Sequence, residues 1–204
     1  MQEREIRAIY DDSIIRVYQA YSPAIAKPAL EAGRFVPPFK LSRMTWIKPS
    51  FCWMMYRSGY ASKPGQEMVL GIDITREGFE WALEHSVVST FKEHLHDNHN
   101  DWKQGISNSP VRIQWDPERD PSLKKIEGVR SIQIGLTGKA IEHYVNEWIV
   151  GIEDVTPVVR SSNKVITSGG IISQPFPNTS ERVYPINSMI SEIIHASATK
   201  PSVS

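Results

Sequence analysis

The chain has little of what would assign it to a class at once. Its 204 residues include a single cysteine, Cys52, so no disulfide can form within one chain and a reducing compartment is expected. No apolar run approaches the ~20 residues that a membrane-spanning helix needs. The charged start of the chain also lacks the apolar core of a signal peptide. We therefore expect a cytoplasmic or nuclear protein that has no membrane partner.

Net charge and strong catalytic motifs are absent too. Lys and Arg number 23, as do Asp and Glu, which argues against a protein that grips duplex DNA by charge alone. There is no Gly-rich phosphate loop, no Gly-x-Ser-x-Gly and no paired-cysteine motif. The one metal-like cluster, His94, His96 and His99 with Asp97, lies in a polar stretch that is typical of a solvated loop. We expect no metal.

The order of the predicted elements favours an α+β fold with a mixed, mostly antiparallel sheet. Strands and helices are mixed but do not alternate regularly, which disfavours a doubly wound sheet. Apolar alternation predicts strands, and helical spacing with capping residues predicts helices. The expected strands cover residues 5–10, 14–20, 68–74, 111–115, 130–136 and 147–155, and the expected helices begin at Pro23, Pro49, Thr75 and Thr137.

The composition changes after Arg160. Residues 161–204 are rich in Ser, Thr, Asn and Pro, which predicts a flexible C-terminal tail beyond a globular domain of residues 1–160. One patch of the tail is an exception, because its apolar residues fall at helical spacing and could dock on the domain or on a partner. That patch consists of Ile186, Met189, Ile190, Ile193 and Ile194.

Residues 43–58 combine aromatic, sulfur-containing and cationic side chains. Cations are costly to bury unless they are paired or bound to an anion. The mixture therefore favours the wall of a pocket for an aromatic, negatively charged ligand such as a nucleotide. The alternative is a core segment whose cations reach out to solvent. In the pocket interpretation, pyrophosphate contacts come from Arg43, Lys48 and Arg57, and base stacking comes from Trp46, Trp53 or Tyr56.

The order of several motifs resembles the ADP-ribosyltransferase superfamily. The motifs are Arg16-Val17-Tyr18-Gln19-Ala20-Tyr21-Ser22, a helix closing at Gly33-Arg34-Phe35, the aromatic helix, the strand at 69–73, and Glu147-Trp148-Ile149-Val150-Gly151-Ile152. The resemblance implies NAD as a substrate, oriented by Arg16 or Gln19. It implies a catalytic carboxylate at Glu147. The candidate nucleotide-binding residues are then Arg16, Tyr18, Gln19, Arg43, Trp46, Lys48, Ser50, Trp53, Tyr56 and Arg57.

One motif departs from that superfamily. Many members have Tyr-His-Gly-Thr where this chain has Tyr18-Gln19-Ala20-Tyr21. Gln19 can hydrogen-bond an amide or a ribose hydroxyl, but it cannot carry charge. The central run Arg-Met-Thr-Trp-Ile-Lys-Pro-Ser-Phe-x-Trp-Met-Met-Tyr-Arg-Ser also looks like the signature of an uncharacterised domain family, over residues 4–160.

Glu147 separates the functional hypotheses. A carboxylate beside the ribose would stabilise the positive charge that builds as the bond to nicotinamide breaks. Strand alternation would place Glu147 on one face with Ile149 and Gly151, although a surface glutamate is the alternative. The first hypothesis is an ADP-ribosyltransferase-like enzyme with an unknown protein or nucleic-acid acceptor. The second is a non-catalytic nucleotide- or RNA-binding module, and the third is an interaction protein.

Overall fold

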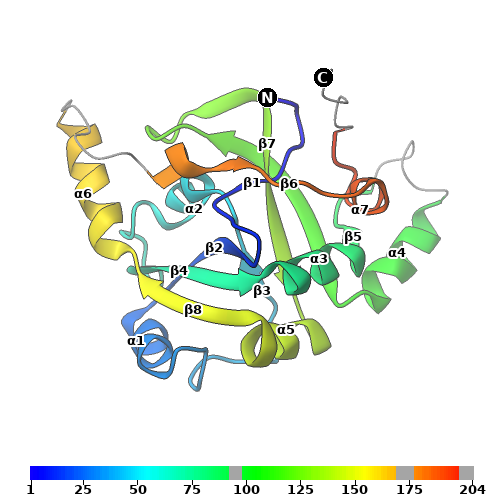
Figure 1. Ribbon diagram of the computed structural model, residues 1–204, viewed down its shortest axis with the longest axis horizontal. Coiled ribbons are helices and arrows are strands. Elements are labelled where there is room, and N and C mark those ends of the chain that lie inside the picture. The colour runs from blue at the N-terminus through cyan, green and yellow to red at the C-terminus, as the bar shows by residue number, and fades with distance from the viewer. Residues whose placement is uncertain (92–97, 169–176, 198–204) are drawn as a thin grey trace.

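The computed structural model describes residues 1–91, 98–168 and 177–197, and it is built around two sheets that cross at a steep angle (Figure 1). The three-stranded sheet is antiparallel and has the order β2 (Ile14–Tyr21), β4 (Met68–Thr75), β8 (Ile149–Asp154). The four-stranded sheet has the order β3 (Thr45–Ile47), β7 (Lys125–Leu136), β6 (Val111–Arg119), β5 (Ser86–Val88). Only its β5–β6 pair is parallel. The predicted α+β class with mixed, mostly antiparallel sheets is confirmed.

The core lies between the two sheets. Apolar side chains alternate along β2, β6 and β7, so one face of each strand enters a single buried cluster. Helices α1 (Pro23–Ala32) and α3 (Arg76–Glu84) add Ala26, Phe79 and Leu83 to it. The opposite face of the three-stranded sheet is covered by α2 (Phe51–Ser58) and α6 (Thr156–Thr167). Both faces of that sheet are therefore packed.

Several helix ends follow the sequence. Gly33 and Gly59 adopt left-handed conformations, with φ of 66° and 59°, and stop α1 and α2. The Thr75 hydroxyl accepts the amide N–H of Gly78 at 3.1 Å and so caps α3. The helix predicted from Pro49 begins two residues later, because Ser50 takes the capping position and accepts the N–H of Trp53 at 3.1 Å.

The strand expected to begin at Glu147 begins later. Helix α5 (Lys139–His143) continues directly into a π-helical turn, η1 (Tyr144–Trp148), and β8 starts at Ile149. The apolar side chains of this turn are buried against the core, which holds the chain in a helix through Trp148. Asn146 does not stop the helix. Its side-chain amide donates to the carbonyl oxygen of Glu142 at 2.9 Å. The polar stretch around His99, which the sequence predicts to be a loop, instead begins helix α4 (His99–Asn108).

Part of the C-terminal segment packs on the domain. The expected boundary after residue 160 falls inside α6, and the segment expected to be flexible contributes buried residues to the core. Tyr184, Ile190 and Ile194 are each at most 2% exposed. The composition of the whole stretch hides these few apolar residues, which fall where helix α7 (Ser188–Ile193) and the chain before it meet the domain.

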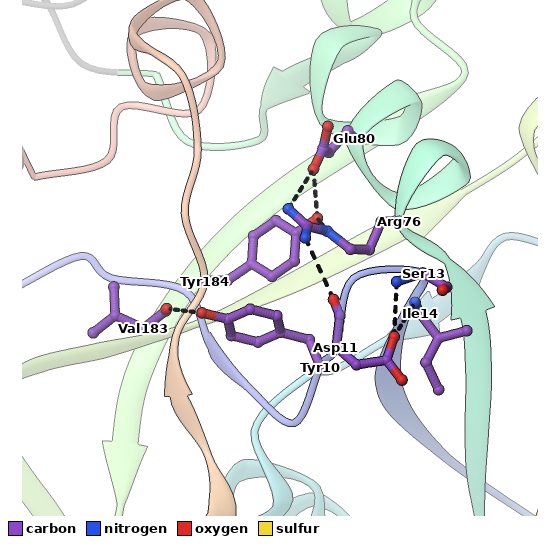
Figure 2. Close-up of polar contacts among 8 residues, drawn as sticks. All are labelled: Tyr10, Asp11, Ser13, Ile14, Arg76, Glu80, Val183 and Tyr184. Atoms are coloured by element: carbon purple, nitrogen blue, oxygen red, sulfur yellow. Dashed lines mark hydrogen bonds and ion pairs between the residues drawn. The ribbon is translucent and has the colours of Figure 1, made fainter.

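Backbone pairing joins the same segment to the start of the chain. Strand β9 (Arg182–Val183) pairs antiparallel with β1 (Arg7–Ala8). The strand expected over residues 5–10 is thus shorter than predicted, since β1 covers only two of these residues. Figure 2 shows the Tyr10 hydroxyl donating to the carbonyl oxygen of Val183 at 2.8 Å and Arg76 donating to the Tyr184 hydroxyl at 2.9 Å. The segment therefore braces both the N-terminal turn and helix α3.

Candidate functional site

The larger of two described cavities, here called the loop pocket, lies between α1, the loop of residues 33–44 and β3. Its volume is about 380 Å³. Two of the residues around it are cations, and none of the described residues that line it is Asp or Glu. The lining residues of the loop pocket are Tyr21, Ser22, Ile25, Pro38, Phe39, Lys40, Arg43, Met44, Thr45 and Gly65. A cavity of this composition has a positive potential and favours an anionic ligand.

Aromatic rings form one wall of the loop pocket. The Tyr21 and Phe39 rings meet edge to face at 5.8 Å, and Phe35 stacks on Phe39 at 4.4 Å from behind. The Tyr21 and Thr45 hydroxyl oxygens are 2.7 Å apart. Burial raises the pKa of Tyr21 to about 12, so its hydroxyl keeps its proton at neutral pH. The pocket thus offers a ring edge and two neutral hydroxyls beside its two cations.

The buried side chain of Gln19 holds these two hydroxyls in place by hydrogen bonds. Its side-chain nitrogen lies 2.6 Å from the Thr45 hydroxyl and 3.0 Å from the Tyr21 hydroxyl. Its side-chain oxygen accepts the hydroxyl of Tyr144 at 2.8 Å. Gln19 is only 2% exposed, so it holds the pocket wall in place and does not itself line the cavity. Through Tyr144 it also ties the pocket to the turn that carries Glu147.

Glu147 lines a second cavity of about 270 Å³, here called the η1 groove. Its carboxylate lies 2.8 Å from the Nδ1 atom of His143, and its side chain is 62% exposed. The groove shares none of its described lining residues with the loop pocket. Those residues are Thr75, Glu77, Gly78, Trp81, His143, Glu147 and Trp148. Single π-helical turns are frequent at functional sites, and this turn points Glu147 into the groove.

Packing shapes the η1 groove. The Trp81 and Trp148 rings lie 5.5 Å apart, and Trp81 also stacks on His85 at 3.9 Å. A Cβ atom at Gly78 would lie 2.3 Å from the Trp148 ring, so only glycine admits that ring here. The expectation that Glu147 shares a strand face with Gly151 is wrong, because the π-turn ends before β8 and Gly151 faces Asp73.

Arg16 lies outside both cavities. Because side chains alternate along β2, Arg16 lies on the face opposite Gln19. There its guanidinium donates to the carboxylate of Asp73, with one bond of 2.7 Å, and also to the carboxylate of Glu153. The hydrogen bonds to Asp73 raise the pKa of Arg16 above its ordinary value. Tyr18, on the same strand face, is buried with its ring 5.4 Å from that of Phe51. Neither residue lines a described cavity.

The central segment is divided by the fold. Arg43 lines the loop pocket, whereas Lys48 just after β3, Ser50 at the cap of α2 and Trp53 within α2 are buried. The Lys48 ammonium donates to the carbonyl oxygen of Trp46 at 3.1 Å. Burial, with help from the nearby Arg57, lowers the pKa of Lys48 to about 7.

A polar cluster surrounds the start of α2. Ser50 donates to Glu118 at 3.0 Å, and the amide N–H of Phe51 donates to Glu181 at 2.7 Å. Burial raises the pKa of Glu181 to about 8 and also raises that of Glu118. Further along the helix, Trp53 stacks on Tyr56 at 5.2 Å, and the Arg119 guanidinium lies 3.8 Å from the centre of the Tyr56 ring.

Residues 5–184 match the family described as a domain of unknown function, DUF4291. The chain belongs to the DUF4291 family. Comparison with curated proteins finds no match. The DUF4291 match extends past the expected boundary at residue 160 and includes β9 and Tyr184, which agrees with the packing of the C-terminal segment.

Two further findings concern the part of this DUF4291 chain that the structure describes. Across residues 1–91, 98–168 and 177–197, no group of three His, Cys, Asp or Glu side chains could hold a metal ion. His94, His96 and Asp97 lie outside the described residues. Within the same ranges, no helix has the length and apolar character to cross a membrane.

Sequence reasoning missed part of each cavity. Phe39 and Lys40 are not among the predicted site residues, although an aromatic ring and a cation directly after Pro37 and Pro38 repeat the mixture seen at residues 43–58. His143 and Trp81 were missed because their side chains meet Glu147 only in the folded chain. The spacing of four residues between His143 and Glu147 brings them together only because the helix continues through Glu147, where the sequence predicts a strand.

Proposed function

We propose that this protein binds NAD in the loop pocket and transfers ADP-ribose from it, as an enzyme of ADP-ribosyltransferase type. One observation carries the proposal: the pocket combines Lys40 and Arg43 with the aromatic edge of Tyr21 and Phe39 and has no described carboxylate in its lining. Phosphate oxygens pair with Lys and Arg, and bases and nicotinamide rings pack on aromatic side chains.

The size of the loop pocket supports the same ligand class. Sites for small molecules usually enclose about 300–1,000 Å³. The loop pocket, at about 380 Å³, has room for one nucleotide half of NAD rather than for the whole molecule. The hydroxyls of Tyr21 and Thr45, held by Gln19, provide hydrogen-bonding partners for an amide or a ribose. Preformed donors of this kind orient a ligand at little entropic cost.

Glu147 supplies the chemistry in this proposal. The C1′–N bond to nicotinamide breaks, nicotinamide leaves as a neutral base with the bonding electrons, and the ribose becomes cationic. The Glu147 carboxylate stabilises that cation and takes the proton of the acceptor nucleophile as the new bond to C1′ forms. Because Glu147 lines the η1 groove and not the loop pocket, the reacting ribose has to extend from the loop pocket to the groove.

The proposal is tested by calorimetry with NAD and by release of nicotinamide. We expect NAD and ADP to bind at one site, and adenosine, which lacks phosphate, to bind at least tenfold more weakly. Nicotinamide release is assayed alone and with protein and nucleic-acid acceptors. Absence of binding by NAD and ADP would reject the loop pocket as a nucleotide site.

A second candidate is a nucleotide- or RNA-binding module without catalysis. It is favoured by the separation of Glu147 from the loop pocket and by the engagement of its carboxylate with His143. This candidate predicts that the protein binds a nucleotide or RNA but releases no nicotinamide from NAD, whichever acceptor is added. Release that depends on Glu147 would reject it.

A further inference from the structure

The η1 groove has a charge opposite to that of the loop pocket. Its lining includes the carboxylates of Glu77 and Glu147 and the indoles of Trp81 and Trp148, and none of its described lining residues is Lys or Arg. Indole faces attract cations through the negative potential of the ring, and carboxylates pair with them directly. The combination is typical of a site that recognises an organic cation.

A cation of the protein already lies at this surface. The Lys139 ammonium is positioned over the Trp81 ring, 5.4 Å from its centre. Lys139 is exposed and no ion pair holds it among the described residues, so its flexible side chain can swing into water. The position of Lys139 is independent of the two carboxylates, and it shows that the ring accepts a positive charge in this setting.

The size of the groove restricts the ligand. At about 270 Å³ it lies below the usual range of small-molecule sites, about 300–1,000 Å³. A whole dinucleotide does not fit, whereas a single side chain does. A guanidinium group suits the walls best, since it is planar, stacks on indoles and offers a fork of N–H donors to a carboxylate.

We infer that the η1 groove binds a guanidinium group of side-chain size, as carried by an arginine of a partner protein. The binding itself is independent of NAD. The role of that arginine as the docking or acceptor group of a second substrate rests on the proposed function.

The probe is ethylguanidinium, with N-ethylurea as a neutral molecule of nearly the same shape. Titrations followed by NMR read the indole N–H signals, which are assigned with Trp81→Phe and Trp148→Phe. We expect the signals of Trp81 and Trp148 to shift saturably with ethylguanidinium in the millimolar range and not with N-ethylurea. Equal shifts with both molecules would overturn the inference, and ethylammonium shows whether planarity matters beyond charge.

Three variants and one control test the geometry. Glu77→Gln and Glu147→Gln should each weaken binding about five- to tenfold by removing a charged acceptor. Glu84→Gln removes a carboxylate from the same helix outside the groove and should change the affinity less than twofold. Lys139→Gln should tighten binding two- to fivefold, because it removes a competing cation from Trp81. Tighter binding excludes simple unfolding as the cause, and weaker binding in Lys139→Gln would contradict the assignment.

The two proposals fail in different measurements. If NAD binds by calorimetry while the indole signals do not respond to ethylguanidinium, the groove assignment alone is lost. If the indole signals respond while NAD and ADP do not bind, the proposed function is lost and the cation site remains.

Discussion

The loop pocket and the η1 groove have linings of opposite charge. Lys40 and Arg43 line the first, whereas Glu77 and Glu147 line the second. Both are partly aromatic, but the loop pocket is the larger of the two, at about 380 Å³ against about 270 Å³. The difference in lining charge means that the two cavities favour ligands of opposite sign.

The two cavities are also held in shape by different forces. In the loop pocket, buried hydrogen bonds from Gln19 fix the hydroxyls of Tyr21 and Thr45. In the groove, close packing of Trp148 on Gly78 sets the wall. A substitution that removes the hydrogen bonds of Gln19 should therefore affect the loop pocket first. A substitution that changes side-chain volume at Gly78 or Trp148 should affect the η1 groove first.

Loss of the C-terminal segment should have the largest effect, since it braces α3, one wall of the groove. A chain that ends at residue 176 loses three buried side chains, those of Tyr184, Ile190 and Ile194. At about 1.5–3 kcal/mol each, their loss approaches the whole stability of an ordinary domain, about 5–15 kcal/mol. We expect no cooperative thermal transition by calorimetry. A truncated chain that melts like the full chain would restore the flexible-tail interpretation.

Glu147→Gln should separate the groove from the loop pocket in function. Nicotinamide release should fall by at least ~100-fold, because the charge that stabilises the cationic ribose is removed. The dissociation constant for NAD should change less than about threefold, since Glu147 does not line the loop pocket. Unchanged release would reject Glu147 as the catalyst, and an equal loss of affinity and turnover would place it in the binding site.

Glu181→Gln should change stability while leaving both cavities intact. Burial raises the pKa of Glu181 from 4.5 to about 8, so its contribution to stability is fully present below pH 4.5 and is lost as the pH rises toward 8. Between pH 5 and 7 the wild type should lose on the order of 2 kcal/mol more than the variant. Lys48 does not interfere, since its lowered pKa, about 7, acts at higher pH. Denaturant unfolding at several pH values measures the difference, and parallel curves would contradict it.

Gly78→Ala should damage the groove and spare the loop pocket. The added methyl would meet the Trp148 ring at 2.3 Å, which forces a shift that costs about 1–3 kcal/mol. Binding of ethylguanidinium should be lost, while NAD affinity should stay within twofold. The control is Gly105→Ala in α4, where the nearest described atom is 3.7 Å away and stability should be unchanged or slightly higher. If Gly78→Ala leaves the groove functional, the packing account is wrong.

Arg43→Ala and Arg57→Ala form the smallest and most direct test of the loop pocket. Both arginines are exposed and belong to the same predicted segment, but only Arg43 lines the cavity. We expect NAD affinity to fall about tenfold with Arg43→Ala, the loss of one charge-assisted contact, and less than twofold with Arg57→Ala. Equal effects in calorimetry would show that the nucleotide lies along α2 instead.

Local signals predicted much of the fold. Alternation in β2 and β4 and the caps at Ser22, Gly33 and Thr75 depend on near neighbours, so the sequence contains them directly. The π-turn at Glu147 was beyond reach, because buried contacts of Tyr144 and Trp148 with distant residues hold it.

The candidate site was predicted less well. The mixture of cations and rings at residues 43–58 indicated a pocket near Arg43, but it gave Lys48 the same role. Side-chain direction decides between the two, since Lys48 turns into the protein while Arg43 stays at the surface. Pattern alone does not contain that direction, because it depends on how β3 meets β2 through the bridge between Tyr18 and Lys48.

The pairing of β1 with β9 has a consequence for synthesis on the ribosome. Arg7 lies opposite Val183, so one of the first strands to be made waits for one of the last. At about 5–20 residues per second, that wait is on the order of 10–35 s. During this time Ile6 and Ala8, which are buried in the finished protein, lack the cover that Tyr184 and its neighbours later provide. The nascent chain therefore emerges with β1 unpaired, and this gap closes only when β9 has left the ribosome.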